Sequence, residues 1–248
     1  MRNIKLVIQY DGTNYSGWQI QPNRRTIQGS LEDALLKITK IQTRVIGAGR
    51  TDAKVHALAQ VANFKTESAI PAEKFVSALN SVLPPDIRVI EASEEDENFH
   101  ARFSARGKIY RYYVYSGKYL NVFWRNYVYY YPYPLDLDLM LEAAKFLEGT
   151  HDFRGLAAAN SSTKNFIRTL KSVELKKEGE KLSLQFIGNG FLYNMVRITV
   201  GTLLEIGRKK IKPTVIKEII ETGNRSLAGP TVPAHGLFLV KVLYDDLL

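Results

Sequence analysis

Apolar and polar residues alternate in several short segments of the chain, and this pattern is typical of half-buried β-strands. In the first of them, apolar side chains stand at every second position from Ile4 to Tyr10, and the segment stops at the turn-forming pair Asp11-Gly12. Glu178-Gly179-Glu180 separates two later segments and predicts a hairpin. The other predicted strands cover residues 60–66, 87–92, 109–115, 127–131, 173–175, 182–186 and 236–244.

Other segments repeat their apolar residues every three or four positions, which predicts amphipathic helices. One begins at Ile27, with Thr26 available as its cap. Another is expected to open at Pro71, because proline suits the first helical turn, and Pro84-Pro85 prevents it from continuing. Three more helices are predicted near residues 137–147, 192–203 and 215–221.

The order of these elements predicts an α+β protein built of two domains. Each half combines mainly antiparallel strands with helices in the split β-α-β (ferredoxin-like) order, as a pseudo-repeat of elements and not of residue identity. We expect an N-terminal domain at residues 1–103 and a C-terminal domain at residues 104–248. The acidic run Glu94–Glu97 is interpreted as a solvated connector between the halves.

The amino-acid composition limits the classes of binding partner and of chemistry that the protein can have. The 248 residues carry a net charge of +9, which favours a polyanion such as nucleic acid, with an anionic membrane surface as the rival. No apolar run approaches the roughly 20 residues that span a bilayer, so we expect a cytoplasmic protein. The absence of cysteine excludes disulfides and thiolate catalysis, and the four scattered histidines lack metal-ligand spacing, so no metal site is expected.

The segment Gly47–Ala57 concentrates the candidate chemistry. Gly47 and Gly49 follow a short apolar run, as in a dinucleotide-binding loop, but Asp52 stands where the third glycine would be and would direct a carboxylate at a pyrophosphate. What remains is the pair Arg50 and Asp52 on a flexible loop. From these residues alone, the pair is either a loop-bracing ion pair or part of a site.

Two further features lie in the second half. Arg197 interrupts an apolar helical run, so it either meets a carboxylate or phosphate or lies on the polar face of its helix. Tyrosines in the strand at 109–115 alternate with basic residues, a combination that suits base stacking beside phosphate contacts, although strand tyrosines also serve as core residues. One of these tyrosines, not all of them, is expected to touch a ligand.

Four segments taken together closely resemble the tRNA pseudouridine synthase A family, and the resemblance extends from the first strand to the closing one. They are Tyr10–Gln19, Gly49–Ala53, His100–Ala105 and Gly190–Arg197. An ordered set of this kind is far more specific than any single motif, and it favours a catalytic role for the loop around Asp52.

The resemblance implies conversion of uridine to pseudouridine at about positions 38, 39 and 40 of the tRNA anticodon stem-loop. It also implies a homodimer of two-domain subunits with the active site in the cleft between the domains. By similarity, Asp52 is the catalytic carboxylate, Arg50 holds the loop and the displaced RNA, Tyr110 stacks on the uracil, and Arg197 pairs with Asp52. The isomerisation involves no net redox change, so no cofactor or metal is expected.

One position departs from the family pattern, in which glycine follows Arg-Thr-Asp-Ala. This chain has Lys54 there, which either strains a left-handed backbone by about 1–2 kcal/mol or adds a phosphate contact, the interpretation that we favour. The alternative to an enzyme is a non-catalytic tRNA-binding or chaperone module. A protein of the membrane surface would need a basic amphipathic helix, whereas the predicted helices carry mixed charge.

Overall fold

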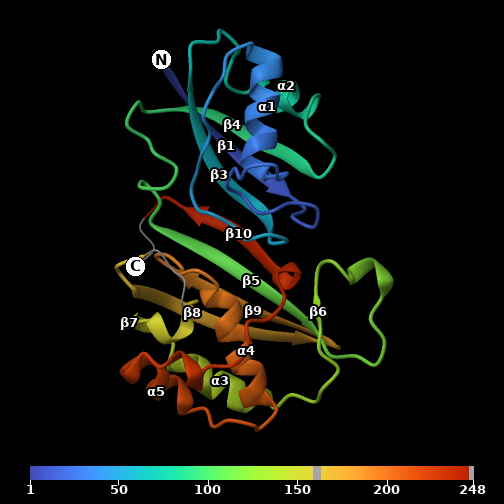
Figure 1. The fold of residues 1–248 in the computed structure, drawn as a ribbon, viewed down its shortest axis with the longest axis vertical. Coiled ribbons are helices and arrows are strands. Elements are labelled where there is room, and N and C mark those ends of the chain that lie inside the picture. Colours follow the sequence, from blue (N-terminus) through green and yellow to red (C-terminus); the bar gives the residue numbers. More distant parts are fainter. Residues whose placement is uncertain (159–162, 246–248) are drawn as a thin grey trace. The chain divides into compact units, whose positions relative to one another are not determined.

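The computed structural model describes residues 1–158 and 163–245, and it confirms a mixed α+β fold (Figure 1). Contacts divide the chain into two compact units. The first contains residues 1–106 together with the C-terminal segment from Phe238, and the second contains residues 107–237.

The first unit has the strand and helix order β-α-β-β-α-β, as predicted, followed by the closing strand of the chain. Its central strand β1 pairs antiparallel with both β3 and β4, while β3 also pairs antiparallel with β2 and parallel with β10. The elements are β1 (Arg2–Tyr10), α1 (Ile27–Thr39), β2 (Ile46–Gly47), β3 (His56–Thr66), α2 (Lys74–Asn80), β4 (Ile87–Glu95) and β10 (Leu237–Leu243).

Local sequence explains these elements. Every second residue of β1 from Ile4 to Tyr10 is buried, as its alternation predicts. Thr26 caps α1 by accepting a hydrogen bond from the Gly29 amide, which confirms the predicted cap. Phe75 of α2 packs edge-on against Phe64 of β3, with 5.3 Å between ring centroids, and so fixes this helix on the sheet.

The second unit has a four-stranded antiparallel sheet in the order β5-β9-β8-β7, with short β6 parallel to the end of β5. Gly179, at φ +57°, turns the predicted hairpin between β8 and β9. Most of α4 is buried, which agrees with its apolar sequence. The elements are β5 (Gly107–Tyr115), β6 (Tyr129–Tyr130), α3 (Leu137–Lys145), β7 (Gly149–Asp152), β8 (Ile167–Glu178), β9 (Lys181–Gly188), α4 (Met195–Gly207) and α5 (Val215–Thr222).

The division of the chain differs from the expected one at its C-terminal end. The units separate after Arg106, close to the expected boundary at residue 103, but the last strand belongs to the first unit. Phe238 pairs in register with His56 of β3, and the Arg106 amide donates to the Leu243 carbonyl. These contacts join residues far apart in the sequence, so local pattern does not reveal them.

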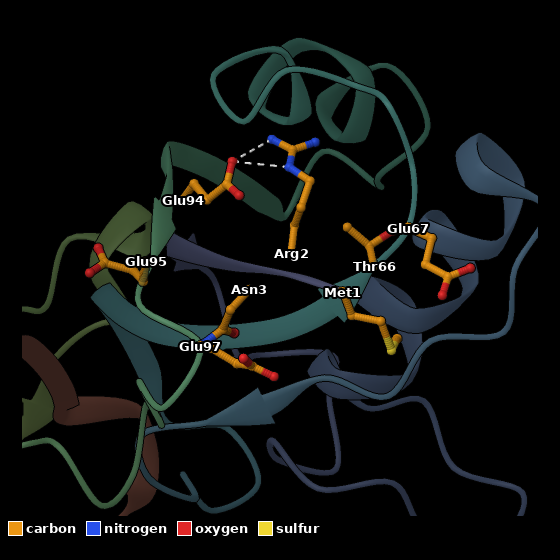
Figure 2. Close-up of a pocket in the computed structure, with 8 residues that line it drawn as sticks. All are labelled: Met1, Arg2, Asn3, Thr66, Glu67, Glu94, Glu95 and Glu97. Atoms are coloured by element: carbon orange, nitrogen blue, oxygen red, sulfur yellow. Dashed lines mark hydrogen bonds and ion pairs between the residues drawn. The ribbon is translucent and has the colours of Figure 1, made fainter.

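The acidic run is not a connector over its whole length. β4 continues through Glu95 (Figure 2), because basic residues of the adjacent strand β1 face its carboxylates. Arg2 forms an ion pair with Glu94 at 2.8 Å, and Lys5 forms one with Glu95. The interpretation of residues 94–97 as a solvated connector is therefore wrong for Glu94 and Glu95.

Candidate active site

The loop that carries Asp52 joins β2 to β3 and is anchored to β3 near its start. The Ala48 amide donates to the Val61 carbonyl at 2.8 Å, and the buried Gln60 side chain donates to the Gly49 carbonyl at 2.9 Å. At the far end, the Val55 amide donates to the Asp52 carbonyl at 3.1 Å and closes a turn. The backbone around Asp52 is therefore fixed by neighbouring strands and turns.

Thr51, the residue before Asp52, is buried and bonded through both its side chain and its backbone. Its hydroxyl lies 2.8 Å from the Tyr10 hydroxyl, and its carbonyl accepts from the Trp18 amide at 3.0 Å. Burial raises the pKa of Tyr10 above its ordinary value, so this phenol stays neutral and remains able to donate. Both contacts come from the Tyr10–Gln19 segment, which explains why this motif accompanies the aspartate loop.

Two glycines of that segment allow the close approach. Gly17 has φ +95°, and a Cβ there would lie 2.6 Å from the Thr51 carbonyl oxygen. A Cβ on Gly12 would lie only 2.0 Å from the Val55 carbonyl oxygen. Since real Cβ atoms do not approach a backbone oxygen so closely, glycine is required at both positions for this segment to pack on the Asp52 loop.

Within the loop, Asp52 is half-buried and Arg50 and Lys54 are exposed. Lys54 has φ +66°, the left-handed conformation that favours glycine. Lys54 therefore has the left-handed backbone that the strain interpretation assumes. For a residue other than glycine, this conformation costs about 1–2 kcal/mol. Whether Lys54 also contacts a phosphate stays a prediction.

His56 is a residue that sequence reasoning did not assign to the site. It is buried at the start of β3 and stacks on Phe238 with 4.6 Å between ring centroids. Its Nδ1 lies 3.1 Å from both the Gly12 amide nitrogen and a carboxylate oxygen of Asp11. His56 therefore ties the Asp11-Gly12 turn to the strand after the loop. Its only signal in the sequence is its place within the segment Gly47–Ala57, because His56 belongs to no recognisable spacing.

Tyr110 lies on β5 in the second unit and is 7% exposed. Its ring meets the ring of Phe191 edge-on at 5.0 Å, which brings together two of the segments singled out in the sequence. Strand alternation buries Tyr112 as well, but its hydroxyl donates to the Pro233 carbonyl at 2.6 Å, so that side chain is committed to the core. Tyr113 and Tyr115 are half-buried, and the assignment of the ligand contact to Tyr110 among the strand tyrosines stays a prediction.

Arg197 occupies the first turn of α4 and is half-buried. Its Nε donates to the Val232 carbonyl at 2.8 Å, and its Nη1 donates to the Asn194 side chain at 2.7 Å. The oxygens of Val232 and Asn194, both in its own unit, therefore orient the guanidinium. The four predicted site residues divide evenly, with Arg50 and Asp52 in the first unit and Tyr110 and Arg197 in the second.

A hollow in the first unit is a poor candidate for the site. It lies among the start of β1 and the ends of β3 and β4 (Figure 2), whereas the Asp52 loop enters the opposite end of β3. At about 3.3 Å per residue, the strand from His56 to Thr66 separates them by roughly 33 Å. Four glutamates line the hollow and would repel a polyanion. Its residues are Met1, Arg2, Asn3, Thr66, Glu67, Glu94, Glu95 and Glu97.

Residues 1–158 and 163–245 contain no group of three or more histidine, aspartate or glutamate side chains placed to hold a metal ion. Within the same ranges, every helix is too short or too polar to cross a membrane.

Comparison with known proteins assigns the chain to a family. A family model described as tRNA pseudouridine synthase matches residues 6–104 and 143–245. The tRNA pseudouridine synthase A of Anoxybacillus flavithermus is 51% identical over 247 residues, which cover 99% of this chain and 100% of that protein. The enzyme of the same name from Caldicellulosiruptor bescii is 50% identical over 244 residues, covering 98% and 100%.

Among solved structures, a Cbf5-Nop10-Gar1 complex matches 81% of this chain and 54% of the matched chain, at 14% identity and a TM-score of 0.35. That likeness is too weak to carry an argument, so the assignment rests on the family model and the full-length relatives. The chain belongs to the tRNA pseudouridine synthase family, whose members are isomerases.

Proposed function

We propose that this protein isomerises uridine to pseudouridine at about positions 38, 39 and 40 of the tRNA anticodon stem-loop, with Asp52 as the catalytic carboxylate. The observation that carries the proposal is the bracing of the Asp52 loop. Thr51 is held by Tyr10 and Trp18, and the Gly49 carbonyl is held by Gln60. A reacting group on a loop must be fixed in this way, because small displacements are costly in rate.

The proposed reaction requires only a carboxylate and a pocket shaped to hold the uridine. The N1–C1′ bond of the uridine breaks, the uracil turns, and a C5–C1′ bond forms. The C5 proton then leaves and N1 is protonated, so atoms and electrons balance without a co-reactant. In the proposed mechanism, Asp52 acts as the nucleophile or as the acceptor of a ribose proton. We expect no cofactor and no metal for these steps.

Three residues are proposed to bind the substrate. The ring of Tyr110, set against Phe191, offers an apolar surface on which a flipped uracil can stack. Arg197 is pre-oriented by Val232 and Asn194 to place a positive charge toward an anion. Arg50 is exposed two residues before Asp52, where it can hold the backbone of the displaced nucleotide.

Oligomeric state, binding partner and cellular compartment are part of the same proposal. We infer a homodimer that works on tRNA in the cytoplasm, and the net charge of +9 favours the polyanionic substrate. The second candidate function is a non-catalytic tRNA-binding or chaperone module. It is favoured by the same charge and by the aromatic strand β5, neither of which requires chemistry.

Release of tritium from C5 of labelled uridine in tRNA tests the proposal, because isomerisation replaces the C5–H bond by a C5–C1′ bond and so frees that proton. Wild-type protein should release it, and Asp52→Asn should not. Asp33→Asn, which changes an exposed carboxylate on α1, is the matched control and should behave as wild type. Equal release by Asp52→Asn and wild type would eliminate Asp52 as the catalytic residue. Tight tRNA binding without any release by the wild type would favour the second function.

A further inference from the structure

Phe103 is an exposed aromatic side chain on a turn that is built rigidly. The side chain is 76% exposed, although phenylalanine is normally buried. It belongs to the His100–Ala105 segment, which the family resemblance singles out but to which the proposed reaction gives no role. Its ring lies 4.3 Å from the His100 ring and 5.7 Å from the Arg102 guanidinium carbon.

The turn is held by hydrogen bonds that leave the phenylalanine ring pointing away from the core. His100 Nδ1 accepts from the amides of Arg102 at 3.1 Å and Phe103 at 3.2 Å. The amide and carbonyl of His100 bond to the hydroxyl and amide of Ser104 at 3.1 and 2.9 Å. A ring presented on such a turn loses little conformational entropy when it meets a ligand.

The same turn is fastened to the sheet beneath it. Ala101 is fully buried, its amide donates to the Asn63 side chain at 2.9 Å, and its carbonyl accepts from the Tyr244 hydroxyl at 2.8 Å. Asn63 in turn donates to Asn3 at 2.9 Å. The backbone of the turn is thus fixed independently of the Phe103 side chain, which can be exchanged without unfolding the turn.

We propose that Phe103 is a stacking platform for an unpaired base of the bound tRNA, at a nucleotide other than the one isomerised. The inference rests on tRNA as the substrate. Arg102, whose guanidinium carbon lies 5.7 Å from the ring, and Arg106, three residues along the chain, are both exposed and supply cations for the adjacent phosphates.

The surroundings of Phe103 favour a base over a protein partner. Of the residues that flank Phe103, Asn98, His100, Arg102, Ser104 and Arg106 are polar, Ala101 is buried, and the ring of Phe99 packs against Tyr244. A stable protein interface buries about 800 Å² on each partner, whereas one base needs only one ring face.

The position of the turn separates this contact from the chemistry. Ala101 is bonded to Asn63, which lies eight residues along β3 from Val55, the end of the Asp52 loop. At about 3.3 Å per residue, roughly 25 Å of strand lies between them. The base on Phe103 therefore belongs to another part of the tRNA, and the contact acts on affinity and placement, not on bond breaking.

Binding of an unmodified tRNA transcript tests the proposal, measured by fluorescence anisotropy with every variant placed in Asp52→Asn protein so that no turnover occurs. Phe103→Ala should raise the Kd by about 5- to 150-fold, the range found for loss of one stacked base. Phe103→Leu should be weakened similarly because it keeps apolar area but lacks a π face, and Phe103→Trp should bind as the parent does. Phe123→Ala removes a ring that is 78% exposed in the second unit and should leave the Kd unchanged.

The salt dependence of tRNA binding separates the contribution of base stacking from that of phosphate contacts. Phe103→Ala should keep the slope of log Kd against log salt, whereas Arg102→Ala should reduce it by about one. Parent-like affinity of both Phe103→Ala and Phe103→Leu overturns the proposal. If Phe103→Ala weakens binding but Phe103→Leu binds as the parent does, and the substitutions change the sedimentation of the free protein, the proposal is also overturned. That result would indicate that Phe103 contacts a second copy of the chain. Wild-type protein that binds tRNA through Phe103 but releases no tritium would refute the proposed function alone.

Discussion

Replacement of Gly17 by alanine tests whether the Tyr10–Gln19 segment braces the Asp52 loop. A left-handed backbone costs a non-glycine residue about 1–2 kcal/mol. The new Cβ would lie 2.6 Å from the Thr51 carbonyl oxygen, so that the 3.0 Å bond from the Trp18 amide would be strained or lost, at about 0.5–1.5 kcal/mol. We expect Gly17→Ala to lower the free energy of unfolding by roughly 2–3 kcal/mol.

The activity of Gly17→Ala should fall further than its stability suggests. Displacement of a reacting group by about 1 Å can cost about 100-fold in rate, so we expect a loss of that order in single-turnover pseudouridine formation at a temperature where the variant is folded. Gly179→Ala is the control, since it also has positive φ but no atom within 4 Å of its would-be Cβ. Urea denaturation and the rate assay are run on both. A Gly17→Ala protein that matches Gly179→Ala in both measurements would refute the bracing argument.

Three further substitutions probe stability. Lys54→Gly should raise the free energy of unfolding by about 0.5–1 kcal/mol in urea titrations by relieving a left-handed lysine; a decrease would show that its side chain stabilises the loop. Thr26→Ala should lower it by about 1 kcal/mol by removing the cap of α1, and an unchanged midpoint would contradict the cap. A hydrogen bond from Lys209 and the amide of Leu139 hold the pKa of Asp136 below its usual range. Asp136→Ala should therefore lower the Tm at pH 7, and the difference should shrink as the pH falls through the folded-state pKa; a pH-independent difference would contradict this linkage.

Local pattern predicts those elements whose stability is local. β1 and α1 agree with their predictions because alternation, helical spacing and the Thr26 cap act within a few residues. α2 begins at Lys74 and not at Pro71, since the amides of Lys74 and Phe75 first bond back to Pro71 and Ala72 in turns. β6 covers only Tyr129–Tyr130 of the predicted 127–131 strand, because the Tyr127 amide bonds to the Trp124 carbonyl in a preceding turn.

Long-range pairing sets the features that sequence could not reveal. β3 begins at His56, four residues before its predicted start, where the segment lacks alternation but pairs with β10. The place of β10 in the first unit has the same cause. At the site, the motifs identified Asp52 as a candidate, but its support by Tyr10, Trp18 and Gln60 depends on strands being adjacent. Backbone contacts of this kind leave no residue pattern except the required glycines.

A nucleotide-resolution map of pseudouridine in tRNA is the sharpest test of whether Asp52 catalyses isomerisation in the anticodon arm. The map compares unmodified tRNA incubated with wild-type, Asp52→Asn and Asp33→Asn protein. We expect pseudouridine at about positions 38 to 40 with wild type and with Asp33→Asn, and none with Asp52→Asn. Pseudouridine formed equally by Asp52→Asn, or found only outside the anticodon arm, would contradict the proposed function.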